Sequence, residues 1–288
     1  MKSQISKIIG VYSIFLFFIY SLANASNLYC SNGGMIMKYN LDGTNGEFIG
    51  GINNNLSARS ISVDSIHNKI YWTNDQGKLY IGNMDTSSKQ IITGSSAYDI
   101  DLDLINNKIY CTNGGMIMRY DLDGTDGEFV GGINNNLGAR SIAVDPIHDR
   151  LYWSDNNGKL WIGNSDTSSR QIITGSSVFD IDLDLIDNSL YCSNGGMIMK
   201  YDLSGSNGEW VGGINNNLNA RSLAVDPLQD NLYWSDTNGK LWMGNLDTSS
   251  RRIITGNSVF DVTLSYPIPE PSTCLILGIG GFFLRNRK

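Results

Sequence analysis

Three cysteines recur at equal intervals, and thiols can bind metals or form disulfides. Cys30, Cys111 and Cys192 lie 81 residues apart, in the strings "YCSNGGMIMKY", "YCTNGGMIMRY" and "YCSNGGMIMKY". Such spacing is compatible with a metal centre, a disulfide system or three copies of one packing arrangement. Choosing among them requires the elements that carry the cysteines.

A second group of reactive side chains consists of aspartates that alternate with apolar residues, so that each group faces one side of a strand. They are Asp99, Asp101 and Asp103, and Asp180, Asp182 and Asp184. Carboxylates in this pattern could bind calcium or act as acid and base, but we favour a structural role. The acidic string "DLDGTDGE" at 121–128 is interpreted as a hairpin turn, because its copies at 40–47 and 202–209 lose carboxylates and keep glycines.

The two histidines give no sign of catalysis. His67 and His148 occupy equivalent positions, and the third copy has Gln229. A base or ligand required by symmetry would not be exchanged in this way. The chain also contains no nucleophile elbow and no HExxH motif, so the sequence predicts no catalytic residues, metal or cofactor.

The elements that carry these residues follow from a shorter repeat. The strings "LYCSN", "IYWTN", "IYCTN", "LYWSD", "LYCSN" and "LYWSD" begin at residues 28, 70, 109, 151, 190 and 232, with spacings that alternate between 42 and 39. Within one unit, short β-rich runs at 141–145, 150–154, 159–163 and 170–174 are separated by turn residues. The sequence predicts an all-β fold: a six-bladed β-propeller of four-stranded antiparallel blades, built as three copies of an 81-residue two-blade unit.

The ends of this repeat predict how the ring closes. The first unit lacks an inner strand, whereas "VFDVTLS" at 259–265 is one strand too many. We expect this last strand to pair beside residues 28–31, which removes both open sheet edges.

The strings at 71–74, 152–155 and 233–236, each preceded by Asp64, Asp145 or Asp226, resemble the YWTD repeats (class B repeats) of the low-density lipoprotein receptor family. The resemblance spans about 240 residues and implies a six-bladed propeller. It also implies that the last Asp of each inner strand bonds to backbone or Ser/Thr groups of the next blade. Alternate units have Cys in place of Trp, and the ligands of the animal receptors are not carried over.

This architecture decides among the three possibilities for the cysteines. They would lie 120° apart on a ring of roughly 10 Å radius, which separates their Cα atoms by about 17 Å, well beyond the ~7 Å limit for a disulfide. The same separation excludes a shared metal. We therefore predict reduced, buried residues that pack with the methionines of the segments 35–37, 116–118 and 197–199.

One face of the ring is the predicted ligand site. Strand alternation places the loops between second and third strands, and those leading to the next blade, on the same side. That side gathers the three "INNNL" strings with alternating arginines and aromatics: Arg59, Tyr98, Arg140, Phe179, Arg221 and Phe260. Aromatic rings stack on sugars and arginines bind carboxylate or sulfate, so a sugar or an anionic group is the hypothesis. The alternative is that the arginines pair with Asp99, Asp180 and Asp261 while the aromatics plug the channel.

Both chain ends are predicted to be targeting signals. Residues 1–25 contain Lys2 and Lys7, an apolar run at 8–22 and an Ala-Asn-Ala site, as in a secretory signal peptide. Residues 267–288 contain Pro269, Glu270 and Pro271, an apolar segment at 274–284 and a basic end, and resemble the bacterial PEP-CTERM sorting signal. The resemblance implies an exosortase-type sorting enzyme as partner, in bacteria that make extracellular polysaccharide. Eleven helical residues reach only about 16 Å, so we expect transient membrane contact rather than a spanning anchor.

These predictions give three regions: a signal peptide at 1–25, a propeller at 27–266 and a sorting tail at 267–288. The net charge of -7 becomes about -11 once both signals are removed, which disfavours nucleic acid and anionic membranes. We expect an exported protein of the envelope, surface or extracellular matrix, with a non-catalytic binding or scaffolding role toward polysaccharide or another surface protein. The alternatives are a metal-dependent lactonase, which needs converging carboxylates and a metal at the channel, and a purely structural spacer.

Overall fold

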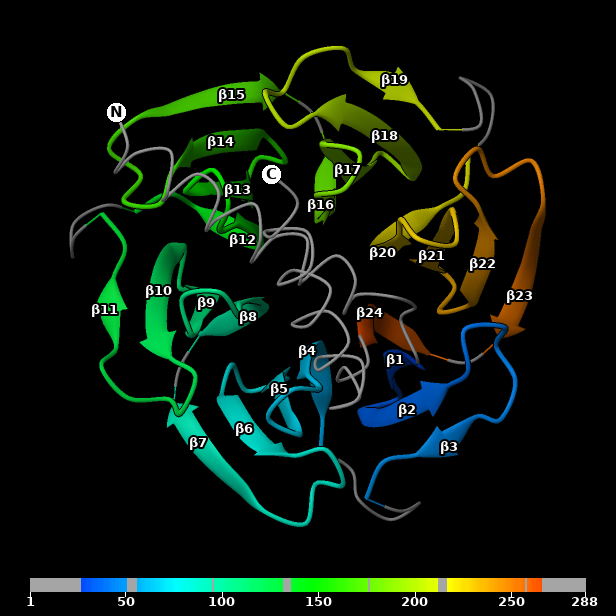
Figure 1. Ribbon diagram of the computed structural model, residues 1–288, viewed down its shortest axis with the longest axis horizontal. Coiled ribbons are helices and arrows are strands. Elements are labelled where there is room, and N and C mark those ends of the chain that lie inside the picture. Colours follow the sequence, from blue (N-terminus) through cyan, green and yellow to red (C-terminus); the bar gives the residue numbers. More distant parts are fainter. Residues whose placement is uncertain are drawn as a thin grey trace, which may run out of the picture.

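Every strand of the described residues belongs to one of six separate four-stranded antiparallel sheets, arranged as blades around a central axis (Figure 1). The computed structural model describes residues 27–50, 56–94, 96–131, 136–175, 177–211, 217–256 and 258–265. The predicted signal peptide, the predicted sorting tail and most of the "INNN" residues of the three loops lie outside these ranges. Within them, no helix is long and apolar enough to cross a membrane.

The blades follow one another along the chain, and in each of them the strands run in order from the channel outward. The first blade contains β24 (Val259–Ser265), β1 (Asn27–Asn32), β2 (Met35–Tyr39) and β3 (Glu47–Phe48). The second contains β4 (Ala58–Asp64), β5 (Lys69–Asn74), β6 (Leu79–Asn83) and β7 (Lys89–Thr93). The third contains β8 (Ala97–Asp103), β9 (Lys108–Asn113), β10 (Met116–Asp121) and β11 (Glu128–Phe129).

The second half of the ring repeats this plan. The fourth blade contains β12 (Ala139–Asp145), β13 (Arg150–Asp155), β14 (Leu160–Asn164) and β15 (Arg170–Thr174). The fifth contains β16 (Val178–Asp184), β17 (Ser189–Asn194), β18 (Met197–Asp202) and β19 (Glu209–Trp210). The sixth contains β20 (Ala220–Asp226), β21 (Asn231–Asp236), β22 (Leu241–Asn245) and β23 (Arg251–Thr255). The predicted fold class, an all-β six-bladed propeller, is confirmed.

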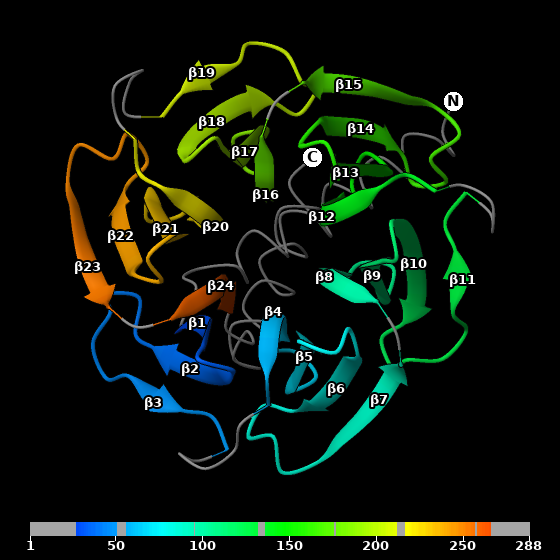
Figure 2. The same ribbon diagram turned by 180° about the vertical axis from the view of Figure 1, so that it is seen from behind.

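The ring is closed by the last strand, as predicted. β24 pairs with β1 in antiparallel register, with Leu264 opposite Leu28 and Val262 opposite Cys30. Seen from behind, β24 occupies the same inner position as the first strand of every other blade (Figure 2). The closing strand therefore joins residues from opposite ends of the sequence and leaves no open edge at the seam.

The hydrophobic core consists of layers between neighbouring blades, and two kinds of layer alternate. In one kind a tryptophan from the second strand of a blade packs on the preceding blade, as Trp72 does on Tyr29 and Ile36. Each such tryptophan also stacks on an aromatic ring of the third strand, with centroids 5.1 Å apart for Trp72 and Tyr80. In the other kind a cysteine and a methionine fill the equivalent space, as Cys111 and Met118 do beside Tyr71.

The prediction that the cysteines are buried, reduced packing residues is confirmed. Cys30, Cys111 and Cys192 are fully buried and free, and each belongs to a different interblade layer. Their cross-strand neighbours are methionines, at positions 37, 118 and 199. Burial raises the pKa of all three thiols, that of Cys111 to about 12.

In five of the six blades, the serine or threonine hydroxyl after the tryptophan or cysteine connects two blades. In the second blade a β-bulge sets two residues, Arg59 and Ser60, opposite Thr73 alone. The Thr73 hydroxyl accepts a hydrogen bond from the Ser60 amide (3.2 Å) and donates one to the Tyr98 carbonyl of the third blade (3.0 Å). The hydroxyls of Ser31, Thr112, Ser193 and Ser235 make the same pair of contacts. Ser154 accepts the corresponding amide bond from Ser141.

We predict that Thr73→Val lowers the free energy of unfolding by about 1–3 kcal/mol, because it leaves a buried amide and a carbonyl without their partner while keeping the side-chain shape. Urea unfolding measures the change. The control is Thr44→Val in an exposed turn, where the hydroxyl donates to Asp42 and accepts from the Asn40 side chain but connects no blades. Equal effects of the two substitutions would contradict a special role for the Thr73 hydroxyl.

We also predict that three of the four thiols resist an aqueous disulfide reagent in the native protein and react at once in urea. Burial both blocks access and keeps the Cys30, Cys111 and Cys192 thiols protonated. The measurement is the rate of thiol titration with and without denaturant. Rapid labelling of all four thiols under native conditions would show that the interblade layers open readily.

Candidate functional site

The β-bulge at the start of each inner strand positions the predicted ligand residues. Because two residues face one on the neighbouring strand, the second residue of the inner strand turns outward and the third turns toward the channel. The second residue is arginine in blades two, four and six, and an aromatic residue in blades one, three and five. All six side chains are exposed: Arg59, Tyr98 (53%), Arg140, Phe179 (52%), Arg221 and Phe260 (42%).

The third residues form a closed ring of hydrogen bonds around the channel. Serines of blades two, four and six alternate there with aspartates of blades three, five and one. Asp99 accepts a bond from the Ser60 hydroxyl (2.8 Å) on one side and from the Ile142 amide (2.8 Å) on the other. Asp180 does the same with Ser141 and Leu223, and Asp261 with Ser222 and Ile61.

This ring differs from the pairing with arginine considered as an alternative. Within the described residues, no ion pair joins Arg59, Arg140 or Arg221 to a channel carboxylate; the ion pairs found there lie in turns and on outer strands. The arginines point outward and the aspartates inward, because they occupy adjacent positions of the same kind of bulged strand. The guanidinium groups thus remain available on the exposed face.

The last aspartate of each inner strand was expected to bond to the next blade, and this expectation is wrong. The Asp64 carboxylate accepts bonds from the amides of Ile66 and His67 (3.0 and 3.1 Å) and contacts His67 Nδ1 (2.6 Å). Asp145 has the same contacts with its own turn, including His148 Nδ1 at 2.7 Å. The chain reverses directly after the strand, so the free amides of the turn lie nearest to the carboxylate.

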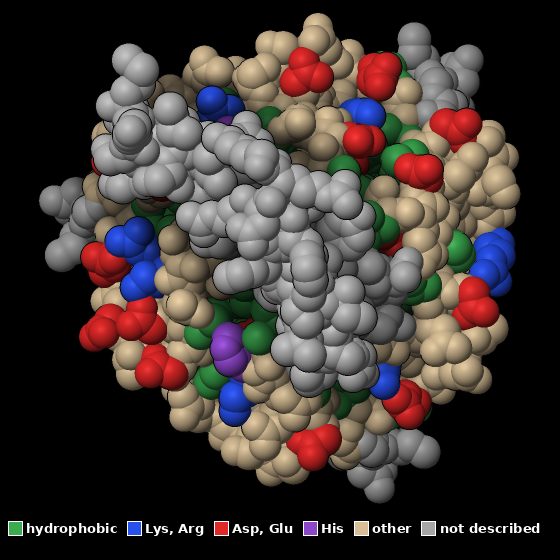
Figure 3. All heavy atoms as spheres, viewed as in Figure 1, with side chains coloured by type: hydrophobic (Ala, Val, Ile, Leu, Met, Phe, Trp, Pro, Cys, Tyr) green, Lys and Arg blue, Asp and Glu red, His purple; other side chains and the backbone are tan. Residues whose placement is uncertain are grey.

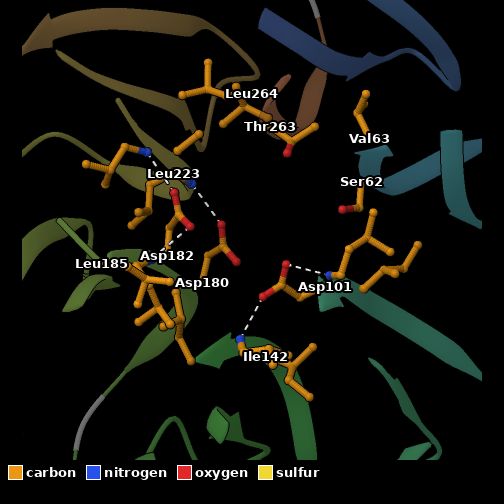
Figure 4. Close-up of a pocket in the computed structure, with 18 of the residues that line it drawn as sticks. Ser62, Val63, Asp101, Ile142, Asp180, Asp182, Leu185, Leu223, Thr263 and Leu264 are labelled. Carbon is orange, nitrogen blue, oxygen red and sulfur yellow. Dashed lines mark hydrogen bonds between the residues drawn. The ribbon is translucent and has the colours of Figure 1, made fainter. Parts of the chain in front are cut away.

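A second layer of carboxylates lies two residues further along the inner strands, and sequence analysis did not distinguish it from the first. Asp101 accepts a bond from the Val144 amide (2.7 Å), and Asp182 from the Val225 amide (2.8 Å). Thr263 takes the equivalent place on β24. Figure 4 shows the carboxylates of Asp101, Asp180 and Asp182 directed into the space between the inner strands.

Enclosure in the channel makes these carboxyl groups weak acids. Burial raises the pKa of Asp101 to about 8, an effect that the Val144 amide reduces and the nearby Asp182 increases. Burial likewise raises the pKa of Asp182 to about 7, and that of Asp261 to about 7 with a further contribution from Asp99. The pKa values of Asp99 and Asp180 are raised for the same main reason. The carboxyls are still in contact with a cavity of about 330 Å³.

The lactonase alternative requires a metal held by converging side chains. Across the described ranges, no three His, Cys, Asp or Glu side chains are grouped so that they could hold a metal ion. The channel carboxylates bind backbone amides and serine hydroxyls instead.

Fold and channel define the class of protein: a six-bladed β-propeller with an alternating inner ring. No family model matches the sequence. Among solved structures, a chain in "Crystal structure of Nidogen/Laminin Complex" is similar to this one, with a TM-score of 0.73 and 15% sequence identity. The match covers 84% of this chain and 99% of that chain. At this level of identity the likeness shows the fold alone.

We predict that the free energy of unfolding falls as the pH rises from 5 to 8. Over this range the folded protein holds protons on Asp101 and Asp182, whereas the unfolded chain, with aspartate pKa values near 3.9, does not. In urea unfolding at both pH values, Asp101→Asn should lose less stability than the parent, by at least about 1 kcal/mol.

The control for this measurement is Asp85→Asn. The Ser87 hydroxyl and amide lower the pKa of this exposed carboxyl, so it stays ionised between pH 5 and pH 8 in both states. Its substitution should leave the pH dependence unchanged. If Asp101→Asn also left it unchanged, Asp101 would be ionised in the folded protein.

Proposed function

We propose that this protein is an exported YWTD-type propeller that binds or scaffolds without catalysis, and that the face carrying the arginines and aromatics binds acidic polysaccharide. One observation carries the proposal: six exposed side chains of two complementary types alternate at equivalent positions of the inner strands. The three aromatic side chains are 42–53% exposed on the same face as the arginines, so both types are accessible to one ligand.

The chemistry of the face suits a sugar polymer with acidic groups. Exposed rings of Tyr98, Phe179 and Phe260 can stack on pyranose faces, and guanidinium groups between them can bind carboxylate or sulfate in a bidentate manner. The rest of the body is acidic, so an anionic ligand needs such a local group of arginines. The similar propeller comes from a complex of nidogen with laminin, which supports a binding role for a propeller of this shape.

The chain ends support the location. The predicted signal peptide and the Pro269-Glu270-Pro271 tail, both outside the described residues, indicate export and handling by an exosortase-type enzyme. A bacterial envelope or extracellular matrix contains the acidic polysaccharides that the proposed face would bind. The proposed role is therefore attachment to, or organisation of, that matrix.

We predict that the triple variant Arg59→Gln, Arg140→Gln, Arg221→Gln loses at least tenfold in affinity for uronate-containing or sulfated glycans on an array. The matched control is the triple variant Lys38→Gln, Arg119→Gln, Lys200→Gln. It removes three cations from β2, β10 and β18, one in each 81-residue repeat. The control should bind as the parent does. Glycan binding by the parent that survives the first variant unchanged would refute the proposed site.

A further inference from the structure

The channel has a second end whose character is opposite to that of the arginine and aromatic face. Its rim consists of apolar side chains from the turns after the inner strands: Leu104, Ile105, Pro146, Ile147, Ile186 and Leu228. An inner strand of seven residues separates the two ends by about 20 Å, at roughly 3.3 Å per residue. Figure 3 shows one face of the ring, on which hydrophobic side chains lie next to the central area.

Apolar side chains of the rim are exposed to solvent. Ile105 is 45% exposed and Leu228 36% exposed, although both lie at the mouth of the cavity rather than on the outer circumference. Together with Pro146 and Ile147 they form an apolar entrance. A mostly apolar cavity with a few placed polar groups is the usual construction of a small-molecule site.

The interior is lined mostly by apolar side chains, and its ionisable groups are all carboxyls. Asp101 and Asp182 lie in one layer with the hydroxyl-bearing Ser62 and Thr263, and the ring of Asp99 and its equivalents lies beyond them. The residues that line the cavity include no lysine, arginine or histidine. Each carboxylate oxygen that accepts one backbone amide can accept a further hydrogen bond, because it has two lone pairs.

The charge of the cavity lining and the volume of the cavity together indicate the chemical class of the ligand. The Asp101 and Asp182 carboxyls become negatively charged as they lose their protons, near pH 7 to 8, and an ammonium ion beside them favours the ionised form, because an opposite charge lowers the pKa of a carboxyl. An anion would be repelled by the ionised carboxylates, and a neutral apolar molecule would displace water from them without replacing its hydrogen bonds. A cavity of about 330 Å³ is at the small end of the range for ligand sites. A cation on a short apolar chain satisfies both the acidic interior and the apolar entrance.

We infer that this cavity binds a small organic cation, with an ammonium head between Asp101 and Asp182 and an aliphatic body along the rim around Ile105 and Leu228. The ammonium group has three donors, which match the carboxylates and the neighbouring hydroxyls of Ser62 and Thr263. Cation binding at this end does not depend on the proposed glycan face, because the two ends share no exposed side chain.

The test compares three six-carbon probes with the purified full chain at about pH 9, where Asp101 and Asp182 are mostly ionised and an alkylamine still carries its proton, by calorimetry or ligand-observed NMR. Hexylammonium should bind at least tenfold more tightly than 1-hexanol, and hexanoate should bind least. The double variant Asp101→Asn, Asp182→Asn should remove most of the preference for the amine. The control variant Asp85→Asn, Asp123→Asn changes net charge equally at exposed turns and should differ less than twofold from the parent.

A measurement on the unmodified protein tests the aliphatic part without relying on a variant that folds. Affinity should rise from butyl- to pentyl- to hexylammonium by about threefold to fourfold per added methylene, as expected for burial along an apolar wall. The inference is overturned if 1-hexanol or hexanoate binds as tightly as the amine, if affinity is independent of chain length, or if the double variant binds as the parent does. Loss of glycan binding in the arginine variant with amine binding intact would separate the two sites.

Discussion

The hydrogen bonds of one serine or threonine hydroxyl per blade are the constraint on which the rest of the structure depends. A β-bulge leaves an inner-strand amide without a ladder partner, and the next blade presents a buried carbonyl at the same place. Unpaired, both groups would destabilise the fold. The Thr73 hydroxyl satisfies both, so the bulge is tolerated and two blades are joined. The bulge in turn directs Arg59 outward and Ser60 into the channel, which creates the exposed face and the inner ring together.

The two-blade repeat follows from the chemistry of that inner ring. A carboxylate such as Asp99 needs a donor on each side, and it finds the Ser60 hydroxyl on one blade and the Ile142 amide on another. If all six positions held aspartate, six carboxylates would face one another around a narrow channel, and none would have a serine hydroxyl as a donor. Alternation of serine with aspartate halves the charge and gives every carboxylate two partners. The alternation of tryptophan-filled and cysteine-filled layers has the same period, so each 81-residue copy is one complete packing unit.

The sequence predicted the features that depend on periodicity and missed those that depend on register. Equal spacing was enough to predict six blades, the closing strand and the burial of Cys30, Cys111 and Cys192. The role of Thr73 was not predicted, because the amide nearest to its hydroxyl depends on a bulge that has no marker residue of its own. The role predicted for Asp64 was wrong, because its carboxylate binds the amides of its own turn. A signal was nevertheless present: all six units have serine or threonine directly after the tryptophan or cysteine, whereas the next residue varies between Asn and Asp.

The two ends of the channel can carry opposite charge without cancelling each other. The arginine face and the apolar rim lie about 20 Å apart along the inner strands, and Asp101 and Asp182 lie three residues, or about 10 Å, from the level of the arginines, which is comparable to a Debye length of roughly 8–10 Å in physiological salt. The ring of Asp99, Asp180 and Asp261 lies between them and is bonded to backbone amides of neighbouring blades. An anion on the arginine face and a cation between Asp101 and Asp182 are therefore partly screened from each other. The direction of the inner strands determines this arrangement. The bulge at the start of each strand positions the arginines and aromatics, and the turn at its end positions the apolar rim.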